Sequence, residues 1–314
     1  MSATNTSIQN TAAEGQHQVQ RQRQGGRKPE SSQSGSLRRG RMIGRPLQYL
    51  ALFAYIVFLG FPLLFLLTAA FKTPRELQSP NPGFFPSTLN WDNFAQAIEK
   101  ANLFTAAGNS LIVAVCTTVL VTLISLPAAY ALARFRTKLR GLATGWILLS
   151  QVFPFILIII PLFLVLKNIG LINSLFGLIL VYTVWSLPFA LWMLQGYVAG
   201  IPVELEEAGA MDGATRFRTL RSIVLPLLAP GLVATSLFTF ISAWNEFFFA
   251  LVLIQDPNLQ TLPLALARFV GAEGQVQLGQ LAAASLLATI PSLVFFMLIQ
   301  KRLTSGLLSG AVKG

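Results

Sequence analysis

The chain has 314 residues, of which 54% are hydrophobic and only 11% are charged, and its formal net charge is +11 at pH 7. Soluble domains carry about a quarter charged residues, so this composition indicates a membrane protein. The single cysteine, Cys116, cannot form a disulfide within the chain. The single histidine, His17, lies in a polar tail, which excludes most metal sites and any Ser/His/Asp or Cys/His arrangement within one chain.

The first segment, residues 1–45, is rich in Gln, Ser, Gly and Arg and almost free of aromatic and branched side chains. Such a segment cannot bury enough apolar surface to offset the entropy lost on ordering. We therefore expect a disordered basic tail over 1–45 and a membrane domain over 46–314.

Six long stretches with at most one charged residue each follow the tail. A bilayer core about 30 Å thick needs roughly 20 apolar residues as a helix, and the alternating pattern of membrane strands is absent. We predict an all-α polytopic membrane protein with six transmembrane helices. The spans lie at about 47–70, 106–132, 143–166, 175–197, 227–254 and 279–300.

The Lys and Arg residues lie unevenly between these spans. Most of the 23 are in the tail, in the connection after the second span, in the connection after the fourth span and at the C-terminal end. The positive-inside rule therefore predicts that both termini are cytoplasmic. Topology and contact with the anionic lipid of the bilayer then explain the net charge, and nucleic-acid binding is not needed to explain it.

The cytoplasmic connection between the fourth and fifth spans, at about 200–226, concentrates charge between apolar runs. Pro202 favours a helix start, and the three glutamates that follow it suit the positive end of a helix dipole. Gly213 favours the end of this first short helix. A second helix is expected to end at Leu225 because a residue before proline avoids helical geometry. Two short helices of this kind form a stiff element that transmits force.

This connection resembles the EAA loop of bacterial ABC importer permeases, whose pattern is Glu-Ala-Ala, three residues, Gly, nine residues, Ile, one residue and Leu-Pro. The stretch "EAG" from Glu207 precedes Gly213 by three residues, and Ile223 and "LP" from Leu225 follow at the family spacing. Gly209 stands where the pattern has alanine. Glycine lowers helix propensity by about 1 kcal/mol but keeps a small surface for close docking.

Four other stretches resemble the maltose-type carbohydrate branch of these permeases. They are "NSLIVA" from Asn109, "LPAAYALARFRTKLRG" from Leu126, "SAWNEFFFALVL" from Ser242 and the ending "SGAVKG". The resemblance extends from about residue 45 to the C-terminus. It implies the MetI-like fold of ABC importer permeases. It also implies a cell-membrane permease subunit of an ATP-driven carbohydrate importer, which forms half of the pore and is not itself an enzyme.

The same resemblance implies a set of partners and coupling residues. The partners are a second permease subunit, two ABC ATPase subunits and an extracytoplasmic sugar-binding protein. ATP and Mg²⁺ bind the ATPases and no cofactor binds this chain, which lacks the G-x-x-x-x-G-K-[ST] motif. The ATPase-coupling residues would be Glu207, Ala208, Gly209, Asp212, Gly213, Ile223, Leu225 and Pro226.

Four polar or aromatic residues within the predicted spans are candidates for the translocation path or for an interface. They are Asn109, Trp244, Asn245 and Glu246. A carboxylate in the middle of a bilayer costs about 2.5–3.5 kcal/mol on insertion scales, so it normally faces a cavity or a partner. Glu246 and its neighbours therefore either line a sugar path or anchor one helix to another. For Asn109, helix capping is the structural alternative.

Two other interpretations remain open at this point. A stand-alone secondary transporter predicts inverted repeats and intramembrane ionisable pairs, whereas this chain has one acid in its spans and no clear repeat. An ABC permease for a non-sugar solute, such as glycerol 3-phosphate, fits the same motif. The sequence does not distinguish maltose, trehalose, other oligosaccharides and glycerol 3-phosphate.

Overall fold

The computed structural model describes residues 34–135, 138–271 and 276–311. The predicted tail lies outside the described residues as far as residue 33, and α2 (Ser34–Ala70) begins within the remainder of that tail. Throughout the described ranges the regular structure is helical, apart from one antiparallel bridge between Val270 and Val276. The all-α prediction is therefore confirmed.

The chain divides into two compact units, residues 1–62 and 63–314. The first unit contains most of α2. After Gln48, its described side chains are apolar or aromatic and almost all exposed. The stretch Gln48–Ala70 is long and apolar enough to cross a bilayer.

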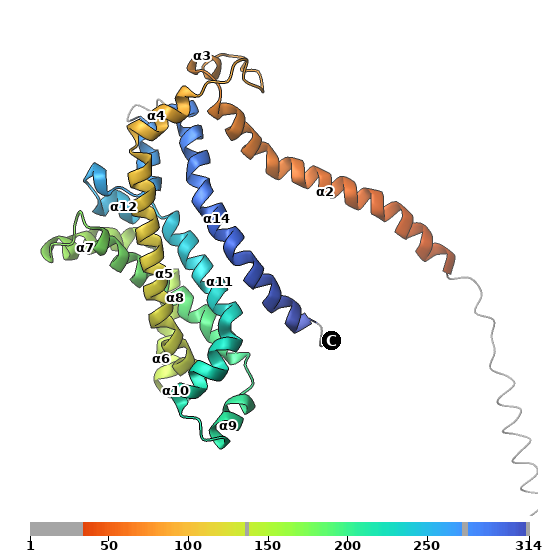
Figure 1. Ribbon diagram of the computed structural model, residues 1–314, viewed down its shortest axis with the longest axis vertical. Helices are drawn as coiled ribbons and strands as arrows, with labels where there is room; N and C mark the ends of the chain where they lie inside the picture. Colours follow the sequence, from red (N-terminus) through yellow and green to blue (C-terminus); the bar gives the residue numbers. More distant parts are fainter. Residues whose placement is uncertain (1–33, 136–137, 272–275, 312–314) are drawn as a thin grey trace, which may run out of the picture. The chain divides into compact units, whose positions relative to one another are not determined.

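The second unit contains the other candidate spans (Figure 1). They are α5 (Leu103–Arg134), α8 (Leu175–Ala199), the continuous stretch Arg216–Trp244 that ends in α11 (Leu225–Trp244), and the apolar part of α14 (Leu278–Ala311). With α2 they make five helices in the described residues that are long and apolar enough to span a membrane.

The third predicted span, at about 143–166, is a bent pair of shorter helices, α6 (Lys138–Val152) and α7 (Ile156–Asn168). The pair bends by 103° at a break that contains Pro154. Proline lacks a backbone N–H and clashes with the preceding turn, which accounts for the break. The described residues therefore hold six spans if this pair is counted as one.

The prediction for the end of the fifth span, at about 254, does not match the helix boundaries. α11 ends at Trp244, and a separate short helix, α12 (Phe248–Leu253), follows after a break. Glu246 lies in that break and bonds the first free N–H groups of α12. A hydropathy pattern does not detect this break because the residues on both sides of it are apolar.

The core of the second unit forms where α5 packs along α8 and α11. Small buried side chains on α5, such as Ala106, Ala114 and Ala129, let the neighbouring backbones approach closely. A second, smaller core consists of Val198, Ile201, Val224 and Leu228, with Leu126, Tyr130 and Ala133 of α5 packed against it. This smaller core lies at the end of the unit that carries α9 and α10 (Figure 1).

The opposite end of the unit is built from short elements held by buried polar contacts. They are α3 (Pro74–Leu77), α4 (Asp92–Lys100), the 3₁₀ turns η2 (Pro257–Leu259) and η3 (Ala267–Phe269), and α13 (Leu262–Leu266). Lys72 is 2% exposed and donates from Nζ to the carbonyl of Gly83 at 2.5 Å. Asn93 Nδ2 donates to the carbonyls of Ala70 and Lys72 at 2.9 and 2.8 Å.

Candidate functional site

The EAA-like motif begins on α9 (Glu204–Met211), an eight-residue helix with three glutamates in its first turn. Its C-cap is Asp212, and Gly213 follows with φ of +81°. That left-handed conformation favours glycine, so the prediction that this helix ends near Gly213 is confirmed. The turn places Met211, which is 88% exposed, at the tip of the segment.

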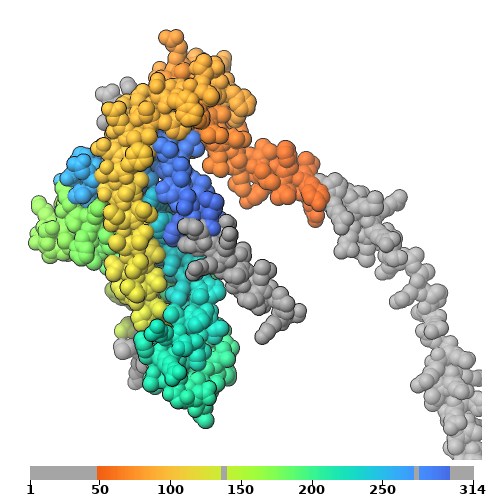
Figure 2. Space-filling model, viewed as in Figure 1, coloured from red at the N-terminus to blue at the C-terminus, as the bar shows by residue number. Residues whose placement is uncertain are grey.

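The chain then enters α10 (Arg216–Thr219), whose N-cap Thr215 accepts a hydrogen bond from Arg218 N–H at 3.3 Å. Phe217 is 73% exposed, and the guanidinium of Arg216 lies 5.3 Å from the ring centre of Phe135. α9 and α10 together form an exposed end of the second unit (Figure 2).

The expected helix end before Pro226 is wrong. A π-helical turn, η1 (Leu220–Val224), joins α10 directly to α11, and Pro226 lies in the first turn of α11. The N–H of Leu225 bonds the carbonyl of Leu220, five residues back. Such a turn shifts the hydrogen-bond register, and the first turn of a helix tolerates proline's missing N–H. The motif's Leu-Pro pair therefore continues into the membrane helix.

The motif residues divide into an exposed group and a packed group. Glu207, Ala208 and Asp212 are exposed, whereas Gly209 is buried beneath the side chain of Ile223. A Cβ atom added at Gly209 would lie 2.5 Å from Ile223 Cδ1. The motif thus presents an acidic surface on one side of α9 and holds α9 against η1 on the other.

Sequence reasoning assigned Glu206 only a helix-dipole role, but the structure shows that it contacts α5. Its Oε1 lies 2.6 Å from Arg134 Nε, and its Oε2 accepts a hydrogen bond from Tyr130 Oη at 2.7 Å. Arg134 Nη2 also donates to the carbonyl of Ile201 at 2.8 Å. The available sequence signal was the position of Arg134 at the end of the second predicted span, which the positive-inside rule predicts to lie on the same side of the membrane as α9.

The other candidates lie elsewhere in the unit. Asn109 is in the second turn of α5 and donates from Nδ2 to the carbonyls of Asn258 and Gln260 at 2.8 and 3.0 Å. It therefore holds the η2 connection and does not cap α5, whose N-cap is Asn102.

Trp244 is 4% exposed and stacks on Phe240 within the core. Glu246 accepts hydrogen bonds from Tyr182 Oη at 2.5 Å and from the N–H groups of Phe249 and Ala250 at 2.9 and 3.3 Å. Asn245 is exposed and bonds the carbonyl of Ile241 at 2.8 Å. These contacts connect α11, α12 and α8.

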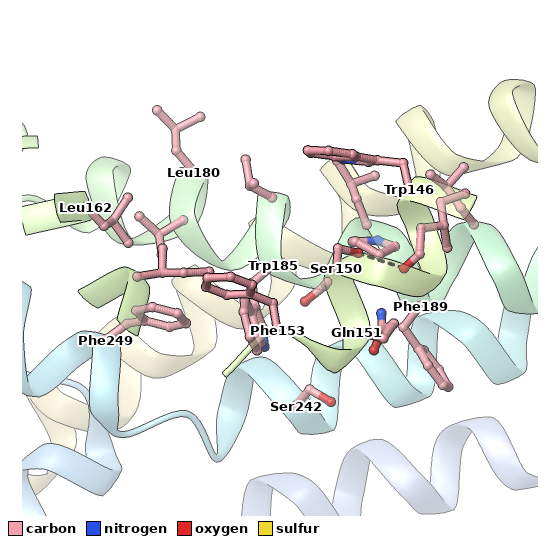
Figure 3. A pocket seen from close by; sticks show the side chains of 18 of the residues that line it. Trp146, Ser150, Gln151, Phe153, Leu162, Leu180, Trp185, Phe189, Ser242 and Phe249 are labelled. Atoms are coloured by element: carbon pink, nitrogen blue, oxygen red, sulfur yellow. Dashed lines mark hydrogen bonds between the residues drawn. The ribbon is translucent and has the colours of Figure 1, made fainter. Parts of the chain in front are cut away.

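A cavity of about 820 Å³ lies between the bent α6–α7 pair, α8 and α11 (Figure 3). Its wall is mostly apolar and aromatic. Trp146 and Trp185 flank it, and four further polar side chains reach it, namely Ser150, Gln151, Ser186 and Ser242. Neither Trp244, Asn245 nor Glu246 is among its lining residues.

The cavity lining holds no ionised side chain among the described residues. No group of three or more His, Cys, Asp or Glu residues in the described ranges is placed to hold a metal ion. The cavity therefore suits a neutral ligand with both apolar and hydrogen-bonding surfaces.

Comparisons with known proteins identify the family. The model of the family described as "binding-protein-dependent transport system inner membrane component" matches residues 121–309. A putative ABC transporter permease protein of Streptomyces antibioticus is 60% identical over 221 residues, which cover 70% of this chain and 96% of that protein.

Several relatives have names that state a substrate, and two of them illustrate the range. The diacetylchitobiose uptake system permease protein DasC of Streptomyces coelicolor is 41% identical, over 83% of this chain and 95% of its own length. The trehalose/maltose transport system permease protein MalG of Thermococcus litoralis is 38% identical, over 81% and 91%.

The fold also occurs in a solved structure. A chain of a bacterial ABC transporter involved in the import of the acidic polysaccharide alginate has a TM-score of 0.70 and 22% identity, covering 87% of this chain and 99% of that chain. With the family match over more than half of the sequence, and with relatives matched over nearly their whole length, the chain belongs to the inner membrane components of binding-protein-dependent transport systems, the multi-pass permeases of ABC importers.

Proposed function

We propose that this permease subunit imports a neutral saccharide, in a complex with a second permease subunit, two ABC ATPases and an extracytoplasmic sugar-binding protein. The observation that carries the coupling part of the proposal is the exposed acidic side of α9, which is held against η1 by the Gly209–Ile223 contact. ATP and Mg²⁺ are held by the ATPases.

The geometry of α9 suits docking onto a partner. Glu207 and Asp212 are exposed and free to meet a basic surface, and Met211 and Phe217 supply exposed apolar contacts beside them. An interface of this composition, with apolar anchors surrounded by charge, is typical of specific protein contacts. With both termini cytoplasmic, α9 lies on the ATPase side of the membrane.

The cavity supports the assignment of a saccharide. Sugar rings carry apolar faces and many hydroxyl groups, and Trp146 and Trp185 offer aromatic surface while Gln151 and three serines offer hydrogen-bonding groups. A phosphate dianion such as that of glycerol 3-phosphate needs cationic or helix N-terminal partners, and no Lys or Arg is among the described lining residues. Two of the relatives are named for oligosaccharides.

Glu246, Trp244 and Asn109 have a structural role in this proposal. Glu246 fills its acceptor sites with Tyr182 and the N-terminus of α12, and Asn109 fills both of its donors with loop carbonyls. Side chains with satisfied hydrogen bonds are poorly placed to exchange partners with a passing sugar. The path therefore runs along the α6–α8–α11 cavity rather than past these residues.

The coupling part is tested by purifying the complex from cells that express the chain with its neighbouring transport genes. The wild type should retain the ATPase and take up the cognate sugar. Glu207→Lys should insert normally in the membrane but lose ATPase retention and uptake, because it places a cation where the partner meets an acid. Glu99→Lys makes the same charge change on α4, at the opposite end of the unit, and should retain the ATPase. Normal transport by Glu207→Lys would refute the coupling assignment.

The path part is tested by Trp185→Ala and Trp185→Phe. The alanine variant should lower the apparent affinity of the transporter for the sugar, because it removes aromatic surface on which the apolar face of a sugar ring can pack. The phenylalanine variant keeps an aromatic face and should retain most of the wild-type affinity for the sugar. Trp91→Ala serves as the control, because Trp91 is also exposed but does not line the cavity. Equal uptake by all of these variants would exclude the cavity from the path.

A further inference from the structure

The covalent connections of α9 do not fix its position. It follows the connection 200–203 and precedes the turn at Gly213, whose φ is +81°. It is only eight residues long, so it has no extended surface on which to pack. Its position relative to the membrane helices therefore depends on a few lateral contacts.

One lateral contact reaches η1 and the other reaches α5. Gly209 lies against Ile223, which continues into α11. Glu206 meets Arg134 and Tyr130 on the last turns of α5. In the described part of the chain, Arg134–Glu206 is the one salt bridge.

The environment makes this salt bridge strong. The side chains of Arg134 and Glu206 are only 11% and 12% exposed, and the small apolar core around Ile201 and Val224 lies beside them. Charges screened from water in this way interact more strongly than surface pairs. Both carboxylate oxygens of Glu206 are used, and Arg134 also holds the carbonyl of Ile201 just before α9.

We propose that Glu206, Arg134 and Tyr130 form a clamp that makes α9 and α5 move as one body. The clamp rests on the proposed coupling role of α9, and it assigns to Glu206 a positioning function distinct from that of the exposed Glu207. When a partner displaces α9, the clamp carries the displacement into α5, whose small buried residues pack along α8 and α11. The Gly209–Ile223 contact carries the same displacement into α11.

The test uses the complete transporter in lipid vesicles with its binding protein. The variants are Glu206→Gln, Arg134→Gln and the exchange Glu206→Arg with Arg134→Glu. Each single variant should retain the ATPase but lower ATP-driven uptake and binding-protein-stimulated ATP hydrolysis by about tenfold, which is the scale of coupling between distant sites. The exchange should restore much of the loss, because it rebuilds the ion pair. Glu204→Gln, an exposed acid on the same helix, should behave as the wild type.

A cross-link tests rigidity independently of the stability of these variants. Arg134→Cys and Glu206→Cys are combined with Cys116→Ser, and the two thiols are joined by a short bismaleimide. Before linking, this protein lacks the ion pair and should show the loss expected of the single variants; if α9 and α5 move together, the covalent link should restore much of the uptake. A transporter that stops after linking would show that the two helices separate during the cycle, which overturns the clamp.

The outcomes distinguish the clamp from the underlying coupling proposal. Wild-type coupling in Glu206→Gln, together with an inactive Glu207→Lys, would overturn the clamp alone. An exchange that fails to restore coupling would do the same if its thermal unfolding matches that of the wild type. Normal transport by Glu207→Lys would instead remove the coupling role of α9 itself.

Discussion

Replacing Gly209 by alanine tests how tightly α9 is held, because alanine is the residue that the family pattern has at this position. The added Cβ would lie 2.5 Å from Ile223 Cδ1 and 3.8 Å from Thr219 Oγ1. Only the first contact is too short, and it involves the terminal methyl of a flexible side chain. A turned Ile223 costs about 0.5–1.5 kcal/mol, while alanine in a helix gains about 1 kcal/mol over glycine. The net change in the free energy of unfolding should be within about 1 kcal/mol.

Gly231→Ala on α11 is the matched comparison. Its Cβ would lie 2.5, 2.8 and 2.9 Å from three atoms of Tyr197, two of them in the ring. A ring cannot turn aside as a methyl group does, and overpacking of this kind costs about 1–3 kcal/mol. Thermal unfolding of the purified complex and uptake in vesicles should show Gly209→Ala near the wild type and Gly231→Ala clearly less stable. A large loss of uptake in Gly209→Ala, with normal expression, would refute the reasoning and give this glycine a geometric role.

Three further predictions concern residues away from α9. Glu246→Ala should destabilise the complex by about 2–4 kcal/mol in thermal unfolding. The reason is that the N–H groups at the start of α12 and Tyr182 Oη lose their acceptor. Lost uptake at unchanged stability would instead favour a role for Glu246 in the translocation path. Asn109→Leu should expose the η2 connection to proteases, since two carbonyls lose their donor at a cost of about 1–3 kcal/mol each; an unchanged digestion pattern would contradict this. Hydrogen bonds from the Ser87 side chain, and from the backbone N–H groups of Thr73 and Ser87, lower the pKa of Glu76 from 4.5 to about 2. Because the pKa is lowered in the fold, the contribution of this carboxylate is present above pH 4.5 and is lost as the pH falls through about 2. Glu76→Gln should therefore speed amide exchange at residues 73–87 at neutral pH but not below pH 2, and equal exchange at neutral pH would contradict the assignment.

The sequence predicted those features that local chemistry determines. Long uncharged stretches identified the membrane helices because no other element satisfies the backbone in lipid. Gly213 correctly marked the end of α9, since its left-handed conformation is one that other residues rarely adopt. Proline breaks a helix through its own missing N–H and its ring, and the break of 103° between α6 and α7 contains Pro154. In each case the decisive interaction lies within a few residues of the chain.

The features that the sequence did not predict depend on tertiary contacts. Pro226 does not end a helix because the π-turn at Leu220–Val224 shifts the hydrogen-bond register before it. Glu206 and Glu207 are neighbours on α9, but Glu206 is the one that contacts Arg134. This difference arises from a contact between residues more than seventy positions apart in the chain, which local sequence does not reveal. The cavity between α6, α8 and α11 likewise exists only once the break at Pro154 has bent the third span.

The contacts at its two ends suit α5 to transmit a displacement of α9 to the other end of the unit. At one end Arg134 holds the carbonyl of Ile201 and the carboxylate of Glu206. At the other end Asn109 holds the carbonyls of Asn258 and Gln260. Side-chain donors thus tie both ends of α5 to the segments that join other helices. Its middle packs mainly through small buried residues, with a hydrogen bond between the hydroxyls of Thr122 and Ser236 of α11 at 3.2 Å. Under the proposed clamp, a displacement of α9 would reach the loops at the far end of the unit along α5, in addition to its route into α11 through Ile223. Breaking either tie of α5 should weaken this coupling without unfolding the bundle.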